Sequence, residues 1–140
     1  MQTLIRLTLL LLTLAAALPA AAAVQSKAID YKDGDTSLRG YLYWDDRYEK
    51  QRPGVLVLHE WWGLNAYARM RARMLAEAGY VAFAPDLYGG GQVTEHAEEA
   101  KGWMQQITAN MEAWQQRARA GLDQLKALEQ VDDENLAAIG

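Results

Sequence analysis

A short apolar run that leads into a cluster of polar and aromatic residues constrains this chain most. Residues 55–58 read Val-Leu-Val-Leu, and His59, Glu60 and two tryptophans follow directly. An apolar run without alternation is typical of a strand buried on both faces, as in a parallel sheet covered by helices. In such sheets ligands bind beyond the carboxyl ends of the strands. The sequence therefore predicts that His59 and Glu60 lie where a site would form.

The first 23 residues are typical of a secretory signal peptide. Arg6 and the amino terminus supply positive charge, residues 7–18 are largely apolar, and Pro19 precedes four alanines. This order matches the charged, apolar and small-residue regions of such signals, and the apolar run is short for a membrane span. We therefore expect a signal peptide over 1–23 and an exported domain over 24–140, periplasmic or extracellular, without stable membrane insertion after cleavage. An uncleaved anchor is the alternative.

Composition and spacing argue against several functional classes. The chain has 14 basic and 18 acidic residues, a formal net charge of −4, and its basic residues are dispersed, which disfavours binding to nucleic acid. It has no cysteine, so neither a disulfide nor a thiolate metal ligand is available. The pair His59-Glu60 does not continue into the metalloprotease pattern His-Glu-x-x-His, because Gly63 stands at the last position. We expect no metal and no other cofactor.

Local patterns predict a hairpin and a helix in the first half of the chain. Residues 28–44 contain two alternating stretches around an Asp-Gly pair, a strong hairpin-turn signal. After the buried strand, Asn65 can cap a helix over 66–78, and Gly79 is a suitable left-handed terminator. Helical spacing predicts that the apolar stripe of this helix consists of Tyr67, Met70, Met74, Leu75 and Ala78.

In the second half of the chain a strand is again followed by a helix. Residues 80–84 predict a second buried strand, and a loop over 86–94 follows. A long helix is expected over 95–129, with Thr108 and Gly121 as places where it can bend. Its apolar residues recur at three or four positions, as Met104, Ile107, Met111, Trp114, Ala118, Leu122, Leu125 and Leu128.

The order of elements indicates the fold class. Residues 131–135 predict a polar turn, and residues 136–139 start another buried strand that leads to Gly140. A hairpin followed by strand, helix, strand, helix and strand is typical of an α/β layered sheet with parallel central strands and right-handed crossovers. We find no internal repeat or linker in the sequence.

Two carboxylates are candidates for chemistry, and each has a structural alternative. Glu60 lies beside two tryptophans, so we expect it to be partly desolvated, which raises a carboxyl pKa unless a partner compensates. The alternative is a salt bridge to Arg69 or Arg73 on the next helix. Asp86 follows a predicted strand end and is either a catalytic carboxylate or a turn residue.

Two further features also have two interpretations. Residues 89–91 are three glycines, but no Lys-Ser or Lys-Thr of a phosphate loop follows them, so a flexible loop is expected. The residues Trp103, Met104, Met111 and Trp114 could line a ligand pocket, although large residues at helical spacing more often form core.

Three segments make the chain similar to a known family. Residues 53–65, 75–88 and 136–140 resemble, in order and spacing, the dienelactone hydrolase family of α/β-hydrolases. The resemblance implies the amino-terminal half of an α/β-hydrolase sheet. It also implies an ester or lactone hydrolase that acts on a small molecule by nucleophilic acyl transfer. An alternative is a non-catalytic exported α/β binding protein, or a remnant of a hydrolase.

The resemblance also implies roles for individual residues. The carboxylate of Glu60 would contact the nucleophilic thiol and tune its ionisation, and the backbone N–H of Trp61 would donate to the oxyanion. Trp62 and Tyr88 would contact the substrate. One departure concerns residues 89–91, which stand where family members acting on dienelactone have an arginine for the substrate carboxylate. Dienelactone itself is therefore not implied.

A second departure concerns the nucleophile. The family's fold carries it on a Gly-x-Ser/Cys-x-Gly elbow, and the acid and histidine of the triad follow later. Gly140 matches the first glycine of that elbow, whereas His59 and His96 precede it. We therefore expect a fold truncated at the nucleophile elbow, with the triad outside these 140 residues, and no activity from them alone. Whether the nucleophile is cysteine or serine stays open.

Overall fold

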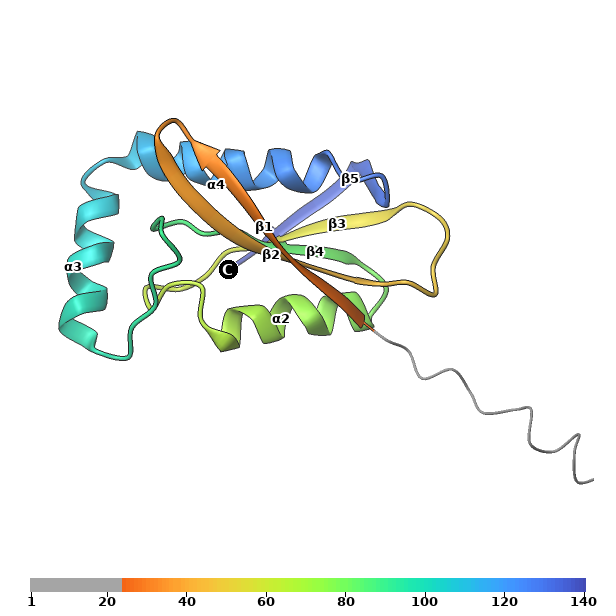
Figure 1. Ribbon diagram of the computed structural model, residues 1–140, viewed down its shortest axis with the longest axis horizontal. Coiled ribbons are helices and arrows are strands. Elements are labelled where there is room, and N and C mark those ends of the chain that lie inside the picture. Colours follow the sequence, from red (N-terminus) through yellow and green to blue (C-terminus); the bar gives the residue numbers. More distant parts are fainter. Residues whose placement is uncertain (1–23) are drawn as a thin grey trace, which may run out of the picture.

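In the part of the chain that the computed structural model describes, residues 24–140, five strands form one mixed sheet with helices on both faces (Figure 1). The signal peptide expected over 1–23 lies outside these residues. In sheet order the strands are β1 (Val24–Asp33), β2 (Thr36–Asp45), β4 (Val81–Ala84), β3 (Arg52–Val57) and β5 (Val131–Ile139). The predicted α/β class is confirmed.

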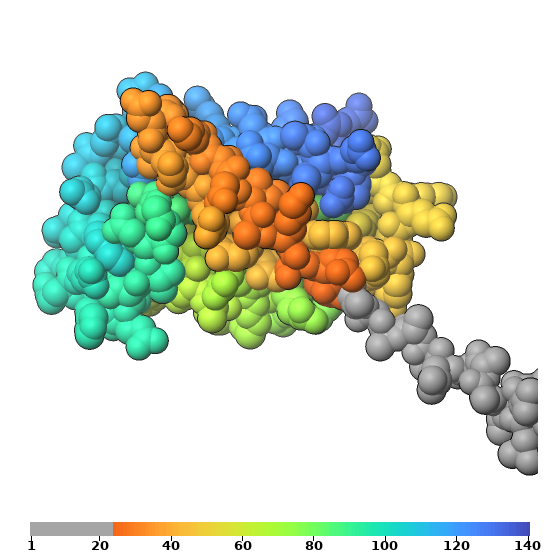
Figure 2. All heavy atoms as spheres, in the orientation of Figure 1, coloured from red at the N-terminus to blue at the C-terminus, as the bar shows by residue number. Residues whose placement is uncertain are grey.

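The hairpin and the parallel centre of the sheet are also confirmed. Strands β1 and β2 pair antiparallel along their whole length. Strand β3 pairs parallel with both β4 and β5, while β2 joins the outer side of β4 antiparallel. In Figure 2 the hairpin crosses the visible side of the molecule between α2 and α4, and in the sheet it forms the edge beside β4.

The central strands are buried on both faces, as their unbroken apolar runs predict. Val55 and Val57 of β3 contribute to one core cluster, and Leu56 between them contributes to the other. The same alternation holds in β4, where Phe83 lies in the second cluster between two alanines of the first. Successive strand residues point to opposite faces, so each face needs its own helix cover.

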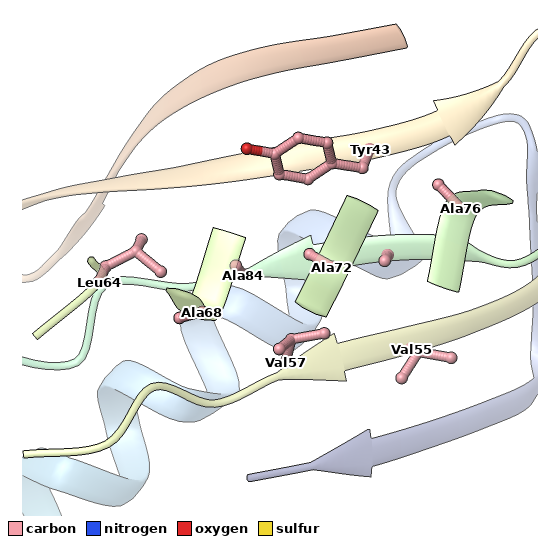
Figure 3. Close-up of a cluster of buried hydrophobic side chains, with 9 residues drawn as sticks. Tyr43, Val55, Val57, Leu64, Ala68, Ala72, Ala76 and Ala84 are labelled. Atoms are coloured by element: carbon pink, nitrogen blue, oxygen red, sulfur yellow. The ribbon is translucent and has the colours of Figure 1, made fainter. Parts of the chain in front are cut away.

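Helix α2 (Ala66–Glu77) covers one face through small residues, and of the predicted apolar stripe Leu75 packs against the core cluster while most other members do not. Its buried residues are Ala68, Ala72 and Ala76, whereas Tyr67, Met70 and Met74 are 45–55% exposed. Figure 3 shows the three alanines over Tyr43, Val55 and Val57. These larger strand side chains already fill the space between the helix and the sheet. The helix therefore packs through small residues, which let its backbone lie close to the sheet. The Asn65 cap is confirmed, because its side chain accepts from the Ala68 N–H at 3.1 Å.

The long helix expected over 95–129 is two helices, α3 (Ala97–Thr108) and α4 (Met111–Lys126). The break follows Thr108, one of the two predicted bends, and the Asn110 side chain caps α4 by accepting from the Ala113 N–H at 3.1 Å. At the other predicted bend, Gly121, the helix is not interrupted, because this glycine lies inside α4. None of the helices within residues 24–140 is long and apolar enough to cross a bilayer.

Strand β5 differs from its prediction in two ways. The expected polar turn over 131–135 belongs to the strand, because pairing with β3 already begins at Val131. Residues 133–135 form an irregularity between two paired stretches, and the Asp132 carboxylate accepts from the Glu134 N–H and the Asn135 amide. The expected burial of 136–139 is also wrong. Within the described residues β5 is an edge strand, and its two alanines are exposed.

Two helix glycines allow a matched test of this packing. A Cβ added at Gly121 would lie 2.6 Å from the Cβ of the rigid Pro85, whereas a Cβ at Gly102 would meet nothing within 4 Å. We expect Gly121→Ala to lower the free energy of unfolding by about 1–3 kcal/mol through overpacking. Gly102→Ala should raise it by about 0.5–1 kcal/mol, since alanine favours helix. Denaturant unfolding measures both, and equal effects would contradict the packing described.

Candidate active site

Two loops meet at the carboxyl ends of the parallel strands β3 and β4. One runs from Leu58 to Asn65 after β3, and the other from Pro85 to Gly91 after β4. Because the two strands are neighbours and run in the same direction, the loops that leave them lie at one edge of the sheet. The predicted position of His59 and Glu60 at this edge is confirmed.

The imidazole of His59 joins the two loops. Its Nδ1 lies 2.7 Å from the carbonyl oxygen of Glu60, and its Nε2 accepts a hydrogen bond from the Leu87 N–H at 3.1 Å. Since Nε2 faces a donor, the ring must be neutral and carry its proton on Nδ1, which donates to the carbonyl. Burial lowers the pKa of His59 and so favours the neutral form.

The contact from His59 orients the peptide unit between Glu60 and Trp61. The same Glu60 carbonyl accepts from the Gly63 N–H at 3.1 Å, so residues 60–63 form a hydrogen-bonded turn. This peptide is trans, and its N–H points opposite to its C=O. The two hydrogen bonds hold the Glu60 carbonyl and so turn the Trp61 N–H to the opposite side of this peptide. There it has no acceptor among residues 24–140.

The next carbonyls of this loop are also held. The Trp61 carbonyl accepts from the Tyr88 hydroxyl at 3.0 Å, and the Trp62 carbonyl accepts from the Thr94 N–H at 3.1 Å. The Tyr88 ring packs at 5.0 Å from the His59 ring. The loop is thus fixed by its acceptors while one donor, the Trp61 N–H, stays available to a ligand.

Asp86 is fully buried and organises the second loop. Its two carboxylate oxygens accept from three backbone N–H groups, those of Tyr88, Gly89 and Gly91, at 2.8–3.0 Å. Both oxygens are occupied by the backbone, so the structure supports the turn interpretation of Asp86 over the catalytic one. All three glycines at 89–91 have positive φ, a conformation that favours glycine. The expected flexible loop is therefore a hydrogen-bonded one.

Arg117 on α4 also anchors this loop, and the sequence analysis missed it. Its Nη1 donates to the carbonyls of Leu87 and Tyr88 at 3.0 and 2.6 Å, and its Nε lies 4.0 Å from the Asp33 carboxylate. One signal could have found it. Arg117 is a charged residue three positions after Trp114 and four before Gly121, on the face of the helix that turns inward.

Glu60 differs from its prediction, because its side chain is exposed rather than partly desolvated. The two indoles beside it pack against each other, with ring centroids 4.7 Å apart. The alternative salt bridge is also wrong. Arg73 pairs with Glu77 at 3.2 Å, and the Arg69 guanidinium lies 4.8 Å from the ring centre of Tyr41. Glu60 has no ion pair within residues 24–140.

The four predicted site residues are only partly brought together. Glu60, Trp61 and Tyr88 line one hollow at the edge of the sheet. Trp62 lines a separate, shallow hollow with Asn65, Thr94 and Glu95. Glu60 also lines a narrow cleft with Arg71, Ile139 and Gly140, so this residue lies beside the carboxyl end of β5.

Comparison with known proteins decides the family. The model of the dienelactone hydrolase family matches residues 38–140. The chain belongs to this family. Among solved structures, one named "m3DLH" is 43% identical with a TM-score of 0.81, and the dienelactone hydrolase-like promiscuous phosphotriesterase P91 from metagenomic libraries is 40% identical with a TM-score of 0.80. In both cases the match covers 84% of this chain and 49% of the other.

Curated relatives agree with the family assignment. A protein of Aquifex aeolicus named "Putative carboxymethylenebutenolidase" is 35% identical over 75 residues, which is 51% of this chain and 31% of that protein. A protein of Escherichia coli named "Putative hydrolase fragment YghX" is 44% identical over 54 residues, 39% of this chain and 46% of that protein. The chain thus spans about half the length of the family members it matches, or less.

The neutral His59 makes the stability of this dienelactone hydrolase-family chain depend on pH. Its pKa is lowered in the folded state, so the unfolded state binds the proton more readily, and the stabilisation is lost as the pH falls below the ordinary value of 6.5. We expect the free energy of unfolding to fall more steeply between about pH 7.5 and 5.5 in the wild type than in His59→Gln.

Urea unfolding at several pH values measures these slopes. The matched control is His96→Gln, because His96 is the other histidine of the chain and is exposed, without a side-chain hydrogen bond to its helix. This variant should keep the wild-type slope. A wild-type slope as shallow as that of His59→Gln would contradict the bridging role of the imidazole.

Proposed function

We propose that this chain carries the oxyanion loop of an ester or lactone hydrolase that works by nucleophilic acyl transfer. The observation that supports it is the outward Trp61 N–H, unpaired among residues 24–140 and held in place through the Glu60 carbonyl. A donor of this kind stabilises charge that develops on a carbonyl oxygen, because it costs no reorganisation at the moment of reaction. We also propose export to the periplasm or beyond, on the basis of residues 1–23.

The proposed reaction has two steps. A cysteine or serine attacks the carbonyl carbon of the ester while a histidine takes its proton, and the carbonyl oxygen becomes an oxyanion that accepts from the Trp61 N–H. The C–O bond to the alcohol then breaks, and the histidine returns the proton to the leaving oxygen. Water, deprotonated by the same histidine, then attacks the acyl carbon. The bond from that carbon to the cysteine or serine breaks, the acid is released, and the histidine returns its proton to the nucleophile.

Glu60 would act on the nucleophile. It lines a cleft with Ile139 and Gly140 at the end of β5, and the fold carries its nucleophile directly after this strand. A nearby negative charge raises the pKa of a thiol, so it keeps the nucleophile protonated until the histidine removes the proton. A carboxylate at this edge therefore suits tuning of the nucleophile better than direct proton transfer to the substrate.

The chain would hold one half of the catalytic machinery. The family members it matches are about twice as long, and we propose that nucleophile, acid and histidine belong to the half of the fold that follows the matched one. On this proposal the 140 residues alone do not turn over an activated ester. Turnover by the purified 140-residue chain that Glu60→Ala abolishes would contradict it.

Removing the Trp61 N–H tests the proposed oxyanion donor in the complete enzyme. Trp61→Pro deletes the N–H, and proline suits the second residue of a four-residue turn, which is the place of Trp61 in 60–63. We expect kcat for an activated ester to fall about 100- to 1,000-fold, the usual cost of one oxyanion donor. Trp61→Ala is the matched control, because it removes the indole and keeps the N–H. Equal losses in the two variants would overturn the assignment of the donor.

A further inference from the structure

We propose that the hollow beside Glu60 binds an uncharged apolar group of the substrate, an aromatic ring or a branched alkyl chain, and rejects a carboxylate. This inference rests on the proposed hydrolase function and names the substrate class that the site selects. The hollow lies between the loops after β3 and β4 and the corner where α3 meets α4 (Figure 1). Its apolar walls are Trp61, Leu87, Tyr88, Met104, Ile107 and Trp114.

The size of the hollow suits one ring. It has a volume of about 210 Å³, and an engineered apolar cavity of about 150 Å³ is enough to bind benzene. Met104 and Trp114 thus belong to a ligand hollow, which was one of their two interpretations. Met111, from the same predicted set, is 49% exposed and lies outside it.

The polar side chains that line the hollow already have partners, apart from Glu60 and the indoles. Both nitrogens of His59 are bonded to backbone, and the Tyr88 hydroxyl donates to the Trp61 carbonyl. The Thr108 hydroxyl donates to the Met104 carbonyl at 2.7 Å. A polar substrate group placed against this wall would lose water without gaining these side chains as partners, which costs free energy.

The charges around the hollow disfavour an anion. Its one charged lining residue is Glu60, and the Asp86 carboxylate is buried beneath the same loop. Among residues 24–140 no lysine or arginine lines it. Arg117 lines a neighbouring hollow and is bound to two loop carbonyls. A carboxylate would therefore be desolvated next to negative charge.

A cation would lose its hydration too. The carboxylate of the exposed Glu60 is itself well solvated, so its attraction for the cation is too weak to replace the lost hydration.

Three probes that share a phenyl ring on a short alkyl chain separate these possibilities in the full chain. They are 3-phenylpropanamide, which is neutral, 3-phenylpropanoate, which is an anion, and 3-phenylpropylammonium, which is a cation. The readout is the indole N–H resonances of Trp61 and Trp114, which line the hollow. Trp44 on β2 is the internal reference, because it packs against the core cluster of Phe83 and does not line the hollow. We expect saturable shifts of Trp61 and Trp114 with the amide, and binding of the anion at least about 10-fold weaker.

A pair of surface variants makes the test specific. Met104→Lys places a cation at the hollow and should strengthen binding of the anion several-fold, whereas Met111→Lys, at an exposed position outside the hollow, should not. Tightest binding of either charged probe to the wild type, or no shift with any probe, would overturn the proposal. Binding is read without turnover, so this outcome is independent of the Trp61→Pro result that tests the hydrolase function.

Discussion

The site depends on one neutral imidazole that accepts at one nitrogen and donates at the other. His59 leaves β3, bonds the carbonyl next to it and reaches across to the backbone of the loop after β4. Neither loop is regular structure, so its backbone groups need other partners, and His59 supplies one to each. The direction of the Trp61 N–H follows from this, because the peptide that carries it is held by its carbonyl. Protonating the ring would remove the acceptor for the Leu87 N–H and so break the link from His59 to the second loop.

The rest of the fold supports this interaction by fixing where the two strands end. Strands β3 and β4 are adjacent, parallel and buried on both faces, so neither can shift without exposing core residues. The second loop is held from three sides, by the Asp86 carboxylate, by Arg117 and by His59. Such a loop is preorganised, and preorganised donors are what transition-state stabilisation requires. The hollow beside it gains part of its apolar character because the polar groups of His59 and Tyr88, which line it, are bonded to the loop backbone.

Strong local signals made much of the fold predictable from the sequence. The Asp-Gly turn, the Asn65 cap and the unbroken apolar runs are set by nearby residues, and the structure confirms each. The stripe of α2 was not predictable in this way, because periodicity favours the largest apolar residues, whereas the sheet left room only for alanines. The edge position of β5 and the exposure of Glu60 likewise depend on which distant segments lie beside them. Arg117 acts on a loop 30 residues away in sequence.

Determining which nitrogen of His59 carries the proton tests this account most directly. In a neutral sample labelled with ¹⁵N at histidine, the account predicts a proton on Nδ1 of His59 and an unprotonated Nε2 that is hydrogen-bonded to the Leu87 amide. The Trp61 amide of the same sample should exchange with solvent faster than the Gly63 amide, which is bonded to the Glu60 carbonyl. A proton on Nε2, or a Trp61 amide as protected as that of Gly63, would contradict it.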